Sequence, residues 1–169
     1  MARLAEVKKA LKEDWTVLPF TGLTLLGFAM AILEFVFFQN FIFQVFGIAG
    51  LFLFLMGGAM RIKARLELNR KAGFGGYFRT WRVKILKDHQ LVTDGLYKHI
   101  RNPIYLAEIL RNLGFVLIFS SVYGSLLILL ASIVLLFRIN LEEKILFVEF
   151  GEEYEEYKRN TKRLIPYIY

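Results

Sequence analysis

Residues 41–60, FIFQVFGIAGLFLFLMGGAM, contain no charged side chain. At a rise of about 1.5 Å per residue, a helix of this length spans roughly the 30 Å hydrocarbon core of a bilayer. The preceding block, residues 15–38, is equally apolar and is interrupted only by Glu34 near its end. The two blocks predict transmembrane helices, and because only Gln39 and Asn40 separate them, we expect these helices to be antiparallel neighbours.

Two more apolar blocks follow in the second half of the chain, at residues 104–119 and 122–137. The first of these carries Glu108, Arg111 and Asn112 in its first half, and a serine-rich turn precedes the second. The four blocks predict an all-α integral membrane protein with four transmembrane helices in two hairpins.

The tail mixes apolar and acidic residues from position 139 to 162, which predicts a C-terminal cytosolic amphipathic helix that is broken near Gly151. We expect the whole chain, residues 1–169, to form one membrane domain.

Composition limits the kinds of chemistry that this chain can carry out. It is 56% hydrophobic, lacks cysteine and contains only two histidines. A disulfide and a thiolate nucleophile are therefore excluded, and we expect no metal site. The net charge is +7, but the basic residues flank the apolar blocks, so we expect membrane lipids as partners and no nucleic acid.

The basic residues also predict the orientation in the membrane. Lys and Arg number four in residues 1–14, eleven in residues 61–101 and six from residue 138 onward, and the turns between paired spans have none. The positive-inside rule then puts both termini and the polar central connection, residues 61–101, in the cytosol. We expect a multi-pass protein of the cell membrane whose first 14 residues form a retained cytosolic helix.

Charged residues within a span need an explanation, because burying an ionised group in a membrane costs several kcal/mol. Glu108 and Arg111 stand three residues apart, so they can pair on one helix face, or they can bind substrate. Gly95 and the Asn102-Pro103 step are turn and helix-start signals. The free amides at such a helix start can hold an anion, including the carboxylate of a cofactor.

Several motifs then occur in a specific order, and together they resemble the isoprenylcysteine carboxyl methyltransferase and phospholipid methyltransferase superfamily. The motifs are LVTDGLY at 91–97, RNPIYL at 101–106, Arg138-Ile139 followed by Glu142-Glu143, and FGEEY at 150–154 followed by Tyr157. The resemblance extends over residues 87–166. One departure is Ala107-Glu108, where the family usually has a glycine.

The resemblance implies a membrane methyltransferase that uses S-adenosylmethionine and lacks a soluble Rossmann fold. Its cofactor pocket is expected on the cytosolic side, in residues 87–105 and 138–166. The implied cofactor-binding residues are Tyr97, His99, Arg101, Asn102, Pro103, Tyr105, Glu142 and Glu143.

The candidate catalytic residues are Arg111, Glu108 and Arg138. Arg111 or Arg101 can hold an acceptor carboxylate, whereas Glu108 is the candidate base for an amine acceptor. Arg138 has a structural alternative, in which it extends its guanidinium to the interface and pairs with Glu142.

The favoured function is carboxyl O-methylation of a lipid-tailed, isoprenylcysteine-like acceptor, and three alternatives remain open. They are N-methylation of a phospholipid amine, an NADPH-dependent enone or sterol reductase, and a non-catalytic membrane binding protein.

Overall fold

The computed structural model describes residues 15–38, 44–72 and 91–166, and the regular secondary structure within them is helical apart from one β-bridge between Ile100 and Lys162. The all-α class is thus confirmed for the described residues. The expected N-terminal helix and the Gln39-Asn40 turn lie outside them. The elements are α2 (Val17–Phe38), α3 (Gln44–Ala72), the 3₁₀ helix η2 (Gly95–Lys98), α4 (Pro103–Ile118), α5 (Val122–Phe150) and α6 (Glu152–Asn160).

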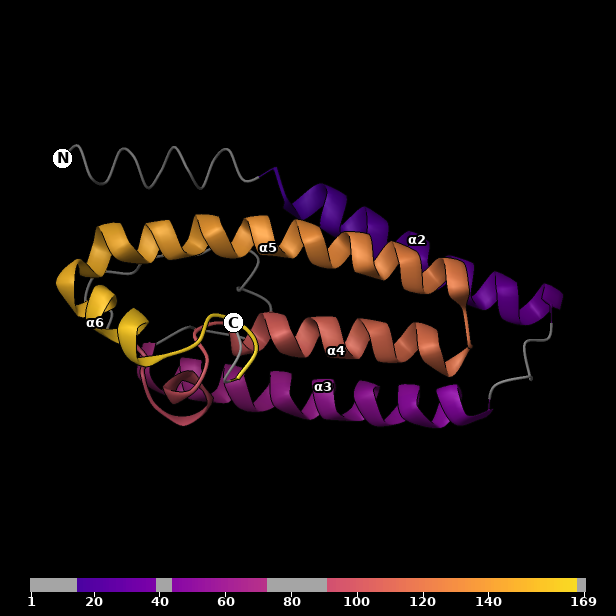
Figure 1. The fold of residues 1–169 in the computed structure, drawn as a ribbon, viewed down its shortest axis with the longest axis horizontal. Coiled ribbons are helices and arrows are strands. Elements are labelled where there is room, and N and C mark those ends of the chain that lie inside the picture. The colour runs from indigo at the N-terminus through magenta and orange to yellow at the C-terminus, as the bar shows by residue number, and fades with distance from the viewer. Residues whose placement is uncertain (1–14, 39–43, 73–90, 167–169) are drawn as a thin grey trace.

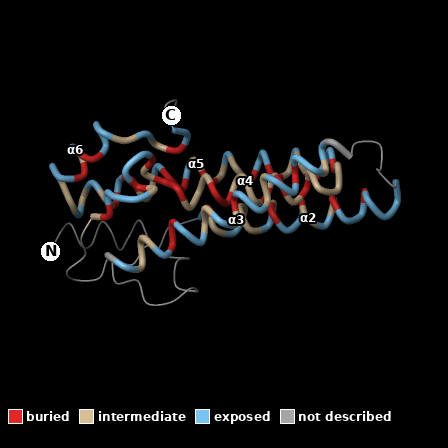
Figure 2. Tube along the Cα trace, turned by 90° about the horizontal axis from the view of Figure 1, so that it is seen from below, coloured by how far each residue is buried: buried red, intermediate tan, exposed pale blue. Residues whose placement is uncertain are grey.

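Within the described ranges, three helices are long and apolar enough to cross a membrane, namely α2, the Phe46–Arg70 part of α3, and α5. Large apolar side chains such as Leu18 and Ile48 are 82% and 72% exposed, and the exposed residues follow the outer faces of the helices (Figure 2). Such a surface requires lipid around it, so the chain is an integral membrane protein. Helix α4 has 16 residues and is shorter than these three, so its status as a fourth span stays a prediction.

The helices pair across the two halves of the chain, with α3 along α4 and α2 along α5 (Figure 1). The predicted packing of the first two spans against each other was wrong, because α2 and α3 share no extensive contact in the described residues. Small residues explain the observed pairing. A Cβ added at Gly57 would lie 2.5 Å from the Arg111 nitrogen, and one at Gly114 would lie 2.4 Å from the Phe54 nitrogen. The backbones of α3 and α4 touch along this stripe, as small residues allow in membrane helices.

Glu34, the one charge in the first apolar block, caps another helix. Its side chain accepts hydrogen bonds from the Ser121 hydroxyl (2.9 Å) and from the backbone nitrogens of Val122 (3.0 Å) and Tyr123 (3.0 Å). These groups begin α5, where unpaired amides and the helix dipole favour a negative charge. Glu34 is buried, and it fastens α2 to the start of α5.

Two helices are longer than the spans predicted from sequence. Helix α3 continues to Ala72, so the first twelve residues of the expected polar connection are helical. That stretch contains no glycine or proline, and most of its residues favour helix. Helix α5 likewise runs past residue 137 to Phe150, and the predicted break occurs at Gly151, whose φ is +57°. The last apolar block and the first part of the amphipathic segment, up to Phe150, therefore form one helix.

This arrangement sets the two ends of the bundle apart. The α4–α5 turn lies at one end, and η2, α6 and the segment that follows α6 lie at the other (Figure 1). The motifs singled out in the sequence belong to this second end.

Two adjacent glycines of α3 provide a test of the helix pairing. We expect Gly57→Ala to destabilise the protein by about 1–3 kcal/mol, because its methyl group would overlap the α4 backbone. Gly58 has nothing within 4 Å of an added Cβ, so Gly58→Ala should leave stability unchanged or raise it through helix propensity. Thermal unfolding in detergent measures both variants, and equal melting temperatures would contradict the close contact of α3 and α4.

Candidate functional site

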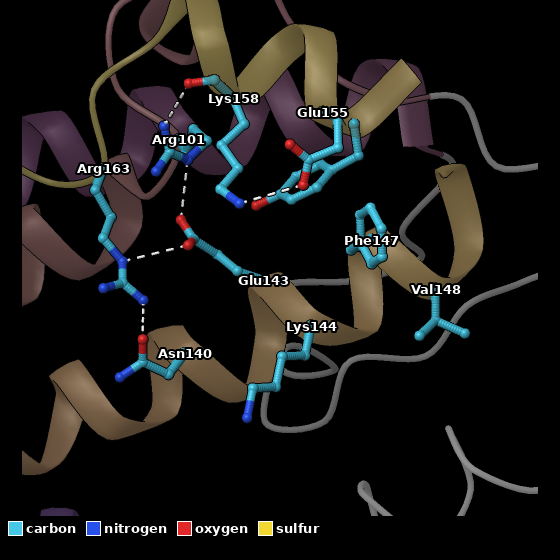
Figure 3. Close-up of a pocket in the computed structure, with 10 residues that line it drawn as sticks. Arg101, Asn140, Glu143, Lys144, Phe147, Val148, Glu155, Lys158 and Arg163 are labelled. Carbon is cyan, nitrogen blue, oxygen red and sulfur yellow. Dashed lines mark hydrogen bonds and ion pairs between the residues drawn. The ribbon is translucent and has the colours of Figure 1, made fainter. Parts of the chain in front are cut away.

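One buried carboxylate joins two motifs that lie about forty residues apart. Glu143 of α5 accepts hydrogen bonds at Oε1 from Arg101 Nε (3.0 Å) and Asn102 Nδ2 (3.1 Å). Its Oε2 lies 3.3 Å from Arg163 Nε (Figure 3). The Arg-Asn-Pro segment that begins α4 and the Glu-Glu pair of α5 therefore meet at this residue.

The same two motif residues, Arg101 and Asn102, hold the end of α6 and the segment after it through backbone carbonyl groups. Arg101 donates to the carbonyls of Lys158 (3.1 Å) and Thr161 (2.6 Å), and Asn102 donates to that of Arg163 (3.0 Å). A guanidinium has five N–H donors, so it can serve a carboxylate and two carbonyls at once. Arg101 thus fixes the path of the chain beside Glu143.

The extension of α3 supports the first motif from the other side. Glu67 accepts a hydrogen bond from the Leu96 nitrogen (2.8 Å), and the Tyr97 hydroxyl donates to the Ala64 carbonyl (3.4 Å). Gly95 has a φ of +61°, and a Cβ there would lie 2.4 Å from the Glu67 carboxyl carbon. Gly95 therefore provides both the left-handed turn and the space that Glu67 occupies.

Three tyrosines near this end are buried and remain protonated at neutral pH. Burial raises the pKa of Tyr97 well above its ordinary value, and the neighbouring Tyr157 and Glu67 raise it further. Burial raises the pKa values of Tyr154 and Tyr157 in the same direction. The Tyr157 hydroxyl donates to the Tyr97 carbonyl (2.8 Å), and its ring lies 6.1 Å from that of Tyr154. Tyr157 thus joins α6 to η2, and Tyr154 packs beside it.

A second cluster lies between α4 and α5. Arg138 Nε lies 2.9 Å from the Tyr105 hydroxyl and 3.2 Å from Glu142 Oε1, and the Tyr105 hydroxyl donates to Glu142. The expected Arg138–Glu142 pair is confirmed. Neighbouring residues of a helix point about 100° apart, so Glu142 contacts Tyr105 of α4, whereas Glu143 contacts the residues just before α4 and Arg163 of the C-terminal segment.

A third cluster surrounds Glu108 of α4. The predicted pairing with Arg111 is confirmed, and Arg61 of α3 forms a second ion pair with the same carboxylate. Asn112 is 1% exposed, and its side-chain oxygen accepts from Arg111 Nη2 (3.1 Å).

Two other predicted cofactor residues, His99 and Pro103, contact none of these three clusters through a hydrogen bond or ion pair of their side chains. The His99 side chain is exposed, and the carbonyl of this residue accepts a hydrogen bond from the Lys162 nitrogen (3.1 Å). Pro103 is buried in the first turn of α4, as its ring favours. Asn102 is the N-cap residue of α4, but its side chain contacts Glu143 and not the helix amides.

A pocket of about 600 Å³ opens beside Glu143 (Figure 3). Of the predicted cofactor residues, Arg101 and Glu143 line it. The lining combines four cations, two carboxylates, two aromatic rings and two smaller side chains: Arg101, Lys144, Lys158, Arg163, Glu143, Glu155, Phe147, Tyr154, Asn140 and Val148. No group of three metal-ligating side chains occurs in the described part of the chain.

The sequence analysis missed three residues that hold these clusters together, Arg61, Glu67 and Arg163. The signal for Arg61 and Glu67 was the unbroken run of helix formers after the second apolar block, which continues α3 into the site. Arg163 follows α6 in a segment without regular structure, and nothing in its local sequence indicates Glu143 as its partner.

Known proteins are similar to this chain in sequence and in fold. A family model described as phospholipid methyltransferase matches residues 45–153. The protein-S-isoprenylcysteine O-methyltransferase of Schizosaccharomyces pombe is 32% identical over 133 residues, which cover 76% of this chain and 53% of that protein. The chain thus spans about half the length of this curated relative.

A solved structure has a similar fold, that of the eukaryotic intramembrane Ras methyltransferase ICMT (isoprenylcysteine carboxyl methyltransferase). Its TM-score is 0.70 at 22% sequence identity, and the match covers 88% of this chain and 52% of that one. The family model covers more than half of the chain and includes the motifs that meet at Glu143. The chain therefore belongs to the isoprenylcysteine carboxyl methyltransferase and phospholipid methyltransferase superfamily.

Proposed function

We propose that this protein is an S-adenosylmethionine-dependent membrane methyltransferase that forms methyl esters on a lipid-tailed, isoprenylcysteine-like carboxylate. The observation that carries the proposal is the junction at Glu143, where Arg101 and Asn102 of one family motif meet the Glu-Glu pair of another. The 32% identical relative is named for isoprenylcysteine O-methylation. Neither the reductase nor the non-catalytic alternative is favoured by the comparisons.

The lining of the pocket beside Glu143 supports S-adenosylmethionine as the methyl donor. Its volume of about 600 Å³ lies within the usual range for small-molecule sites, roughly 300–1,000 Å³. Lys144 and Lys158 suit the carboxylate of the amino-acid part, and Glu155 suits its ammonium group or the ribose hydroxyls. Phe147 and Tyr154 offer rings for the adenine. Arg101 and Glu143 would form the inner wall.

The reaction needs alignment more than acid–base chemistry. An acceptor oxygen forms a C–O bond to the methyl carbon, the C–S bond breaks, and the sulfur leaves as a neutral thioether. A carboxylate acceptor has no proton to lose, so the protein has to orient the reactants and exclude water. Orientation of this kind can lower a barrier by roughly 7–11 kcal/mol. We assign Arg138 a positioning role, because it holds both Tyr105 and Glu142.

Binding of S-adenosylhomocysteine tests the donor side. We expect micromolar affinity, and we expect Asn102→Ala and Glu143→Ala to weaken it by at least about 1.4 kcal/mol, a tenfold effect. Removal of either side chain breaks the junction that forms the inner wall. Calorimetric titration of the detergent-purified chain measures this, with the exposed Glu149→Ala as control. Unchanged affinity for S-adenosylhomocysteine in both site variants would contradict the proposal that the cofactor binds in the pocket beside Glu143.

The methyl product separates the two superfamily chemistries, since the matching family model is named for phospholipid methylation. We expect methyl-labelled donor and native membranes to give a lipid-soluble product that releases labelled methanol in base, because an ester hydrolyses and an N-methyl group does not. Boiled protein is the control. Label that stays on the lipid after base treatment would favour amine N-methylation and contradict the ester.

We also propose that the end of the bundle with η2 and α6 faces the cytosol, with both termini on that side of the cell membrane. The support is the positive-inside rule, since the α4–α5 turn at the opposite end has no Lys or Arg. The chain lacks cysteine, so single cysteines at the exposed Tyr123 and Arg159 give a clean test. An impermeant maleimide added to intact cells should label Tyr123→Cys and not Arg159→Cys. The reverse pattern would invert the orientation.

A further inference from the structure

One buried hydroxyl group of the pocket has no hydrogen-bond partner. Tyr154 of α6 is 1% exposed and lines the pocket beside Glu143. Its hydroxyl oxygen is buried and forms no hydrogen bond within the described residues. Most buried side-chain polar groups in folded proteins are hydrogen-bonded, so an exception needs an explanation. A ligand of the pocket that accepts a hydrogen bond would provide one.

The charged neighbours of this hydroxyl do not supply an acceptor. Arg101 and Arg163 lie close enough to lower the pKa of Tyr154, but a guanidinium can only donate. Glu143 is also close, but its two oxygens already contact two arginines and an amide. Burial is the largest effect and raises the pKa of Tyr154, so the hydroxyl keeps its proton at neutral pH. It is therefore a donor that the protein leaves unused.

Tyr157, three residues further along α6, provides a contrast. It is 8% exposed, and its hydroxyl donates to the Tyr97 carbonyl (2.8 Å). It is not among the residues that line the pocket. The two tyrosines share a helix, and both are buried, with ring centroids 6.1 Å apart. They differ in whether the protein provides an acceptor for the hydroxyl and in whether the side chain reaches the pocket.

The pocket has an exposed rim and a buried inner side. The side chains of Lys158 and Glu155 are 45% and 42% exposed, and Phe147 is 46% exposed. Tyr154, at 1%, belongs to the inner side. Burying a charged group costs more than burying a neutral polar one, so the charged amino-acid part of S-adenosylmethionine suits the rim. The uncharged adenosine then lies on the inner side, beside the Tyr154 hydroxyl.

We propose that the Tyr154 hydroxyl donates a hydrogen bond to the adenosine part of the methyl donor and so helps the pocket to select its cofactor. The inference rests on the proposed S-adenosylmethionine-dependent function and adds a binding residue to it. The adenine ring nitrogens and the ribose oxygens are all able to accept such a bond. Because the hydroxyl has no partner in the protein to give up, the ligand gains a buried hydrogen bond without breaking an existing one.

The test compares Tyr154→Phe with Tyr157→Phe, using the full chain in detergent. Each variant removes one buried hydroxyl from α6 and keeps the ring. We expect Tyr154→Phe to raise the Kd of S-adenosylhomocysteine about tenfold in calorimetric titration, because an acceptor of the ligand would lose its donor. Its melting temperature without ligand should equal or exceed that of wild type, since the lost hydroxyl had no partner.

Tyr157→Phe should give the opposite pair of results. Its melting temperature should fall, because the Tyr97 carbonyl would lose its donor. Its Kd for S-adenosylhomocysteine should stay within about twofold of wild type, because the Tyr157 side chain does not line the pocket. An equal rise of Kd in both variants would overturn the inference, because the placement of α6 and not the Tyr154 hydroxyl would then control binding.

A smaller ligand tests which part of the donor is contacted. 5′-Methylthioadenosine keeps the adenosine and lacks the amino-acid part, so Tyr154→Phe should weaken its binding by the same factor. A loss of affinity for S-adenosylhomocysteine alone would contradict the contact with adenosine. An unchanged Kd for both ligands in Tyr154→Phe would overturn the inference and leave the proposed function standing. Wild-type protein that binds neither ligand would count against the proposed function itself.

Discussion

The site depends on one buried carboxylate with several donors. Glu143 joins Arg101 and Asn102 at the start of α4 with Arg163 beyond α6, and so connects three segments that are distant in sequence. A buried carboxylate is stable only when such donors replace its lost water. The position of the C-terminal segment, and with it the wall of the pocket, follows from satisfying this one group.

The bundle solves the same problem at the two other buried carboxylates of the described residues, Glu34 and Glu108. Glu34 accepts hydrogen bonds from the backbone amides that begin α5, and Glu108 forms ion pairs with Arg111 on its own helix and Arg61 on α3. In each case a charge in an apolar helix has a partner on a different helix. These pairings fix which helices are neighbours in surroundings where apolar contact alone distinguishes poorly between helix faces. The buried carboxylates lie at both ends of the bundle. Glu34 pairs at the end with the α4–α5 turn, and Glu108 and Glu143 pair at the end with the motifs.

The two superfamily motifs have distinct physical roles within this frame. Glu67 accepts a hydrogen bond from the Leu96 nitrogen, and Gly95 leaves room for its carboxylate, so η2 packs on the extension of α3. This contact orients the chain that leads to Arg101. The adjacent carboxylates of α5 then contact different partners: Glu142 contacts Tyr105, and Glu143 contacts Arg101, Asn102 and Arg163.

The sequence by itself determined the all-α membrane class, the apolar blocks and the superfamily, because block length and motif order are local properties of the chain. It also determined the pairs within one helix, Glu108 with Arg111 and Arg138 with Glu142, since helical spacing sets them. Only the tertiary structure decided that α3 packs on α4 and not on α2, and that Arg61, Glu67 and Arg163 belong to the site. Those contacts depend on how closely two helices approach and on where a segment without regular structure finds a buried carboxylate, and neither is encoded by the spacing of nearby residues.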